Sequence, residues 1–130
     1  MKICRSSLPP RIRAVAHAAC LALIMFGSVA NARPAQSQAA PPELAAVVEE
    51  RAAYRRASAG WMRAIIQCES RWNVYAVGSA GELGLVQLHP RGLLPEFYQL
   101  GYSDPFDPSE AIDYLAWALV HGRASHWSCA

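Results

Sequence analysis

The sequence lacks a large excess of charge of either sign. It holds 12 lysines and arginines against 10 acidic residues in 130 positions, a formal net charge of +2, which excludes a polyacidic or polybasic tail. It also lacks compositional bias, so a collagen-like or low-complexity chain is excluded. No segment alternates apolar and polar residues as a half-buried strand does, and no internal repeat is present. A mostly helical chain with no more than one domain is therefore predicted.

Positive charge is concentrated at the start of the chain, where residues 1–32 hold four cations and no acid. An uncharged, mostly apolar run over residues 14–30 follows, and an Ala-Asn-Ala triplet occupies residues 30–32. This order is typical of a secretory signal peptide, so cleavage after Ala32 and export to the periplasm or the exterior are predicted. The alternative is an uncleaved membrane anchor, because the run approaches the ~18 residues needed to span a bilayer. Membrane contact is expected only in that case.

Cleavage at this site would reverse the sign of the net charge. The remaining 98 residues hold 8 cations and 10 acids, so their formal charge is −2. A nucleic-acid-binding protein is disfavoured, because it would lack the electrostatic attraction to phosphates on which such binding depends.

The cysteines that would remain are Cys68 and Cys129, because Cys4 and Cys20 lie in the signal segment. In an oxidising compartment two cysteines usually form a disulfide, so a Cys68–Cys129 bond is predicted. Linking positions 61 residues apart would stabilise the fold by about 4 kcal/mol in the chain-entropy model. The alternative is a pair of unpaired, buried thiols.

The exported chain divides into a tether, a helix and a helical domain. Residues 33–42 lack large apolar side chains and are predicted to form a disordered linker. An N-terminal helical segment follows at residues 43–59, with the helix itself expected over residues 43–57. The domain proper is predicted to span residues 60–130.

Local signals place three helices and one loop in this domain. Apolar spacing predicts a helix over residues 61–71, and four glycines mark residues 73–92 as a long shaped loop. A short helix is expected at Pro95–Leu100, with proline at its first position. The tetrad Asp107-Pro108-Ser109-Glu110, close to a capping box, predicts the start of the last helix, and Gly122 its end.

Glu69 has surroundings that favour acid chemistry. It lies near the C-terminal end of the predicted helix 61–71, where exposed carbonyls disfavour an anion. Ile65 and Ile66 are its same-face neighbours, and apolar surroundings also disfavour the charged form. Arg71 could oppose both effects. On balance Glu69 is predicted to stay protonated more than an ordinary glutamate, as a general acid requires; the alternative is a solvent-facing helix residue without a chemical role.

The glycine-rich loop could bring its backbone close to a ligand. Gly78, Gly81 and Gly84 allow sharp turns, and the exposed peptide groups suit a polyhydroxyl substrate. Gln87 adds an amide with both donors and an acceptor. The pattern is not a phosphate loop, because the Gly-Lys-Ser/Thr ending is absent. The alternative is an ordinary connection between helices.

Two ordered motifs cover these residues. The first, Glu-Ser followed by a polar or aromatic pair and Asn, occupies residues 69–73, and the second, Gly-x-x-Gly-Leu-x-Gln-Leu-x-Pro, is complete at residues 81–90. With them, residues 60–130 resemble the soluble lytic transglycosylase domain of the lysozyme-like superfamily. The resemblance implies a small lysozyme-like helical domain with a glycine-rich active-site loop. It also implies action on peptidoglycan glycan strands, with Glu69 as the catalytic acid/base and no cofactor or metal.

The resemblance further implies a set of substrate-binding residues. They are Ser70, Ser79, Gly81, Gly84, Gln87, Tyr114 and Trp127. The family's late Ala-Tyr-Asn motif, whose tyrosine helps to place the catalytic glutamate, is absent here, and Tyr114 or Trp127 is expected to replace it. Trp127 could also stack on a sugar ring or cover the disulfide. Glu82 stands where the family often has a small residue, and it is the candidate second acid, the alternative being a solvated loop acid.

The implied activity is that of a lytic transglycosylase. Such an enzyme cleaves the β-1,4 bond between N-acetylmuramic acid and N-acetylglucosamine and leaves a 1,6-anhydro end, for which one acid/base suffices. One alternative is a hydrolytic, lysozyme-type muramidase, which normally uses two carboxylates. The other is a non-catalytic peptidoglycan-binding accessory module, which the missing tyrosine motif would favour.

Residues outside the motifs receive structural interpretations. Arg51, Arg55 and Arg56 are expected on a solvated helix surface, and Trp61 and Trp72 in the core. The histidines at positions 89, 121 and 126 do not make a metal set, because 121 and 126 miss a common helical face.

Overall fold

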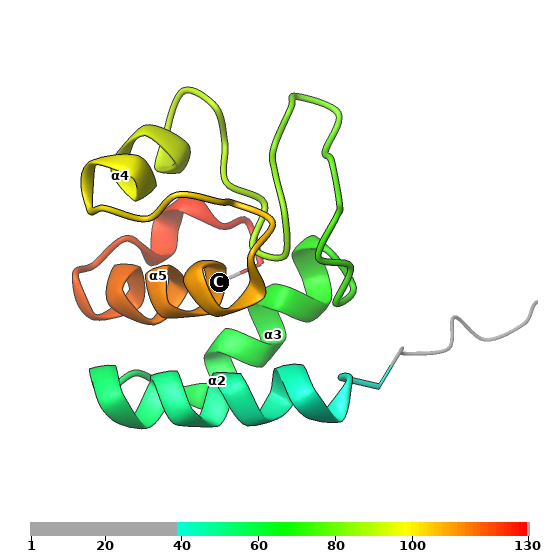
Figure 1. Ribbon diagram of the computed structural model, residues 1–130, viewed down its shortest axis with the longest axis vertical. Helices are drawn as coiled ribbons and strands as arrows, with labels where there is room; N and C mark the ends of the chain where they lie inside the picture. Colours follow the sequence, from blue (N-terminus) through cyan, green and yellow to red (C-terminus); the bar gives the residue numbers. More distant parts are fainter. Residues whose placement is uncertain (1–38, 130) are drawn as a thin grey trace, which may run out of the picture. The chain divides into compact units, whose positions relative to one another are not determined.

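The computed structural model describes residues 39–129, in which four α-helices and one short 3-10 turn carry the fold. The elements are α2 (Pro42–Arg55), α3 (Ala59–Glu69), α4 (Leu93–Gln99), α5 (Pro108–Val120) and η1 (Ala124–His126), as Figure 1 shows. The predicted mostly helical, small lysozyme-like architecture is confirmed. Within residues 39–129 no helix is both long and apolar enough to cross a membrane.

The predicted signal peptide at residues 1–32 and most of the linker at 33–42 lie outside the described residues. The end of that linker is described, and Pro42 is already the first residue of α2. Proline fits this position because the first turn of a helix has no use for its missing N–H. Helix α2 ends at Arg55, and the C-cap residue Arg56 adopts a left-handed conformation with φ of 59°. The helix predicted over residues 43–57 therefore begins one residue earlier and ends two residues earlier than expected.

The start of α5 follows from its sequence. The Asp107 carboxylate accepts a hydrogen bond from the Glu110 N–H at 2.9 Å, and Pro108 occupies the first turn, so the predicted cap is confirmed. The Glu110 carboxylate does not return to the backbone of Asp107. It accepts hydrogen bonds from the N–H groups of Ser103 and Asp104 at 2.7 and 2.9 Å, and so fastens the preceding loop to the helix.

Helices α3 and α4 begin earlier than predicted. Helix α3 starts at Ala59, because the Ser58 side chain accepts a hydrogen bond from the Trp61 N–H and so caps the helix. Helix α4 starts at Leu93, two residues before the proline expected to open it. Both shifts leave the order of elements unchanged.

The core forms where α5 packs against α2 and α3. Most of α5 is buried, including its one acidic side chain in mid-helix, Asp113. That carboxylate accepts two hydrogen bonds from Arg55 of α2, at 3.0 and 2.6 Å, and one from the Tyr102 hydroxyl at 2.6 Å. A buried charge needs such partners. Arg55, predicted to lie on a solvated surface, is therefore half-buried, with its side chain 29% exposed and paired with Asp113.

The two tryptophans predicted for the core behave differently. Trp72 is 6% exposed, as predicted, whereas Trp61 is 40% exposed. Trp72 lies beyond the end of α3 with φ of 66°, and its indole N–H donates to Gln67 at 2.9 Å. Because α3 ends at Glu69, Trp72 does not share a helical face with Trp61.

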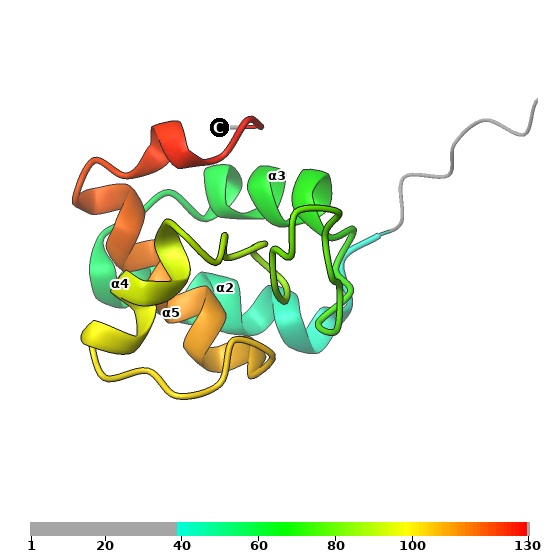
Figure 2. The same ribbon diagram turned by 90° about the horizontal axis from the view of Figure 1, so that it is seen from above.

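The glycine-rich loop between α3 and α4 folds back on itself. Isolated antiparallel bridges join Val77 to Leu83 and Leu83 to Leu88, and the Gly78 N–H donates to the Glu82 carbonyl at 2.8 Å. Figure 2 shows this loop beside the end of α3, with the C-terminal segment returning along the same helix. The first motif, the second motif and the C-terminal segment thus come together.

Candidate active site

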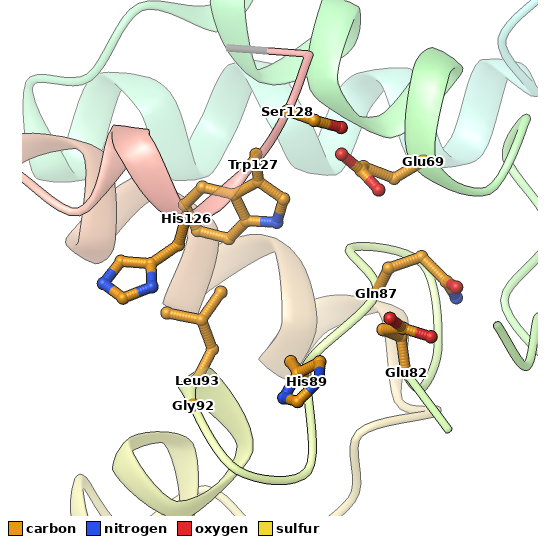
Figure 3. A pocket seen from close by; sticks show the side chains of 9 residues that line it. All are labelled: Glu69, Glu82, Gln87, His89, Gly92, Leu93, His126, Trp127 and Ser128. Carbon is orange, nitrogen blue, oxygen red and sulfur yellow. The ribbon is translucent and has the colours of Figure 1, made fainter. Parts of the chain in front are cut away.

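Glu69 is the last residue of α3, with Ser70 as the C-cap. The expected position at a helix C-terminus is therefore confirmed. The adjacent turns of α3 bury Met62, Ile65 and Ile66 completely, so the backbone that carries the carboxyl group is firmly anchored. In Figure 3 the Glu69 side chain extends from the helix toward Trp127 and Ser128.

A cavity of about 290 Å³ opens in front of Glu69. Three parts of the chain form its walls: the end of α3, the glycine-rich loop with the start of α4, and the C-terminal segment. The lining residues are Glu69, Glu82, Gln87, His89, Gly92, Leu93, His126, Trp127 and Ser128. Polar groups therefore converge from segments far apart in the sequence (Figure 3).

Burial raises the pKa of the Glu69 carboxyl above its ordinary value, and the negative charge of Glu82 raises it further. Both effects disfavour the ionised form. Arg71 does not offset them by pairing, since no ion pair joins it to Glu69 within residues 39–129. The predicted direction of the shift is thus confirmed, with Glu82 as a contributor that the sequence did not assign to it.

The second motif positions Glu82 and Gln87 side by side. The Glu82 carboxylate accepts a hydrogen bond from the Ala80 N–H at 3.0 Å. The Gln87 amide donates to the carbonyls of Gly84 and Ala76, at 2.8 and 3.3 Å. Because both amide hydrogens serve the loop, the oxygen is the part of Gln87 that remains for a ligand.

Gly78 makes this arrangement sterically possible. A Cβ atom at this position would overlap the carboxylate of Glu82 and would lie 2.7 Å from the Gln87 amide oxygen. The sequence predicted a sharp turn and a close approach to a ligand at Gly78, but not this packing, because the two side chains that cover Gly78 come from the second motif. Its structural role is to leave room for them.

The structure brings together four of the residues singled out from the sequence: Glu69, Glu82, Gln87 and Trp127 line the cavity. The Trp127 side chain is only 3% exposed, and its indole N–H donates to the Val86 carbonyl at 2.7 Å. Trp127 thus fastens the C-terminal segment to the glycine-rich loop, and only part of the ring reaches the cavity.

The other predicted substrate-binding residues do not line the cavity. They are Ser70, Ser79, Gly81, Gly84 and Tyr114. The Ser70 hydroxyl donates to the Ile66 carbonyl at 3.2 Å and closes the helix. Tyr114 is completely buried, and its hydroxyl donates to Glu96 at 2.8 Å. Of the two candidates to replace the missing tyrosine, Trp127 is therefore the one in the cavity.

Several cavity residues were not predicted. His89 occupies a variable position inside the second motif, and Leu93 lies three residues beyond it. His126 and Ser128 flank Trp127 near Cys129. For His126 and Ser128 the cysteine pair was the one signal in the sequence. A Cys68–Cys129 bond necessarily brings the C-terminal segment close to Glu69, because Cys68 directly precedes Glu69. That disulfide is present, with Cα atoms 6.2 Å apart.

Comparison with known proteins agrees with this arrangement. A family model described as the transglycosylase SLT domain matches residues 46–127. The match includes both motifs, α2 to α5 except for the first residues of α2, and the cavity-lining residues up to Trp127. A search of curated proteins found no match.

Proposed function

The chain belongs to the transglycosylase SLT domain family, and from this premise we propose that it cleaves the glycosidic bond between N-acetylmuramic acid and N-acetylglucosamine, leaving a 1,6-anhydro end. Membership supports a peptidoglycan-cleaving function of the lytic transglycosylase type at the level of the family. The finer proposal rests on one observation, the Glu69 carboxyl with its raised pKa in the cavity.

In the proposed reaction Glu69 acts first as an acid. Its proton passes to the glycosidic oxygen, the bond from this oxygen to the anomeric carbon of the muramic residue breaks, and the N-acetylglucosamine part leaves as an alcohol. A raised pKa supports this step, because a general acid must hold its proton near the working pH.

Glu69 then acts as a base. Its carboxylate takes the proton of the 6-hydroxyl of the same muramic residue, and that oxygen forms a bond with the anomeric carbon. The products are a 1,6-anhydro end and a protonated Glu69. No water molecule is consumed, so the proposed reaction needs one carboxyl group.

Hydrolysis is the second candidate, and the position of Glu82 favours it. Enzymes that use water normally place two carboxyl groups across the scissile bond, and Glu82 lines the same cavity as Glu69. If hydrolysis occurs, Glu82 is the group that would activate water or stabilise the positive charge of the sugar. The same cavity would then give a reducing end.

The products distinguish these two reactions. Purified peptidoglycan is digested with the protein, and the soluble fragments are weighed by mass spectrometry. The proposed reaction gives glycan ends that are lighter by one water molecule than the reducing ends made by a hydrolase. Fragments with reducing ends only would exclude the transglycosylase reaction and establish a muramidase.

We also propose export to the periplasm or the exterior, where peptidoglycan lies. The support is the signal-peptide pattern of residues 1–32 together with the Cys68–Cys129 disulfide. Disulfides of this kind persist in oxidising compartments and are rare in the cytosol.

A further inference from the structure

The C-terminal strap, defined as residues 126–128, forms a whole wall of the cavity. His126, Trp127 and Ser128 all line it, opposite the glycine-rich loop and beside Glu69 (Figure 3). The strap has little regular structure, since η1 ends at His126. Its position therefore depends on what fastens it to the rest of the domain.

Two attachments hold the strap. The buried Trp127 indole donates to the Val86 carbonyl at 2.7 Å, which joins the strap to the glycine-rich loop. One residue beyond the strap, Cys129 forms the disulfide with Cys68 of α3. The strap is thus tied to both of the other walls of the cavity.

The backbone of the strap adds little further support. The His126 and Trp127 N–H groups donate to Arg123 and Ala124 within the same short turn. Within residues 39–129, the N–H groups of Ser128 and Cys129 donate to no backbone carbonyl. Loss of the disulfide would therefore leave the end of the strap without a backbone attachment.

The disulfide joins the strap to the turn of α3 that carries the acid, because Cys68 directly precedes Glu69. The Cys68 residue is exposed and Cys129 is half-buried, so a reductant can reach the bond. Exposed disulfides are the ones most readily reduced.

We propose that Cys129 is a positioning residue for catalysis: its disulfide with Cys68 holds the strap as a glycan-binding wall, so that the oxidised protein binds peptidoglycan tightly and the reduced protein does not. This inference rests on the proposed function. In the reduction, a dithiol supplies two electrons and two protons, the S–S bond becomes two thiols, and the dithiol becomes a disulfide. Export would then deliver the chain to an oxidising compartment, in which the disulfide forms and holds the strap in place.

The test compares Cys129→Ser with Ser125→Ala, a change at an exposed residue next to the strap that does not line the cavity. Initial rates are measured over a range of peptidoglycan concentrations. We expect Cys129→Ser to raise KM about tenfold while kcat changes much less, because the strap contributes binding and not proton transfer. Ser125→Ala should leave both parameters unchanged. Reduction of the wild type by dithiothreitol should reproduce the higher KM, and reoxidation should reverse it.

Trypsin reports the state of the strap directly. Arg123 precedes the strap and is exposed, so release of the strap should speed cleavage after Arg123 in Cys129→Ser and not in Ser125→Ala. An unchanged KM with faster cleavage would show that the strap is not a glycan-binding wall. An unchanged KM with unchanged cleavage would show that the disulfide does not hold the strap. Either result overturns the proposal.

A second variant covers the case in which Cys129→Ser fails to fold. Trp127→Phe removes the indole N–H that donates to Val86 and keeps the disulfide. Because the disulfide still holds the strap, we expect at most a small rise in KM with kcat retained. A rise as large as the one that dithiothreitol causes in the wild type would contradict the proposal. The proposed role of the strap can also be tested separately from the proposed cleavage reaction. For this, binding of an N-acetylglucosamine–N-acetylmuramic acid tetrasaccharide to the Glu69→Gln protein is measured with and without dithiothreitol. It tests the strap even if no bond is cleaved.

Discussion

Glu69→Gln is expected to lower the rate of peptidoglycan cleavage by about 10³-fold, because general acid–base catalysis by one positioned side chain contributes roughly 10²- to 10⁴-fold. Glutamine has the size of glutamate but cannot donate a proton to the glycosidic oxygen. The measurement is clearing of a gel that contains cell-wall material, followed by initial rates on soluble glycan strands.

Loss of folding would not explain this result. The surroundings of Glu69 raise its pKa, so the folded state disfavours the ionised carboxylate. Above the ordinary glutamate pKa this reduces the free energy of unfolding, and a neutral glutamine removes the penalty. At neutral pH we therefore expect Glu69→Gln to unfold at the same temperature as the wild type or a higher one.

The control is Glu43→Gln, an identical change at an exposed position in the first turn of α2. It should clear the gel like the wild type. Equal clearing by Glu69→Gln would remove Glu69 from the reaction. A wild-type protein that binds the gel material without clearing it would establish the non-catalytic accessory module instead.

Gly84→Ala is expected to lower the free energy of unfolding by about 3 kcal/mol, as the sum of backbone strain and overpacking. Gly84 has φ of +73°, a conformation that residues with a Cβ avoid, and a Cβ there would overlap the carbonyl oxygen of Pro105. This oxygen belongs to the backbone and cannot turn aside as a flexible side chain can. The loop that carries Glu82 and Gln87 would have to shift.

Gly122→Ala provides a matched control for the backbone term. Gly122 also has φ of +73°, but a Cβ there would meet no atom within 4 Å. We expect a loss of about 1 kcal/mol, since only the unfavourable conformation is added. Urea unfolding of both variants, with the disulfide intact, measures the difference. Equal losses would mean that the contact with Pro105 does not constrain the glycine-rich loop.

Signals between near neighbours in the sequence predicted the fold well. Asp107 and Pro108 define the start of α5, and their effect depends on the next few residues alone. The C-terminal position of Glu69 in α3 was predicted in the same way, although Ser58 moved the start of that helix. Because these interactions join residues only a few positions apart, they can be predicted from a short stretch of sequence.

Interactions between distant segments were harder to predict. Arg55 pairs with Asp113, 58 residues away, so its ion pair with a buried residue of α5 cannot be recognised from the pattern of α2 alone. The strap reaches the cavity through Cys129 and Trp127, whose partners are Cys68 and Val86. Of these contacts, only the disulfide was predictable, because Cys68 and Cys129 are the two cysteines outside the predicted signal peptide.

The second motif was predictable in part. Its glycines indicated sharp turns, and positive φ at Gly81 and Gly84 confirms them. That Gly78 leaves room for Glu82 and Gln87 could not be read from the sequence, because it depends on how the loop folds back. The effect of the Glu82 charge on the pKa of Glu69 could not be predicted either, because it also depends on how the loop folds back.

Burial and the charge of Glu82 raise the pKa of the Glu69 carboxyl in the free protein, and this shift underlies the proposed role of Glu69 as an acid. Titration of the glutamate side-chain carboxyl carbons by nuclear magnetic resonance, in the wild type and in Glu82→Gln, tests it most directly. We expect Glu69 to titrate above the ordinary glutamate value and above Glu96, whose pKa is lowered by hydrogen bonds from Tyr114 and Arg123 that outweigh its burial. Glu82→Gln removes a negative charge and should move the Glu69 midpoint to lower pH. A Glu69 midpoint at or below that of Glu96, or one that Glu82→Gln leaves unchanged, would contradict this account.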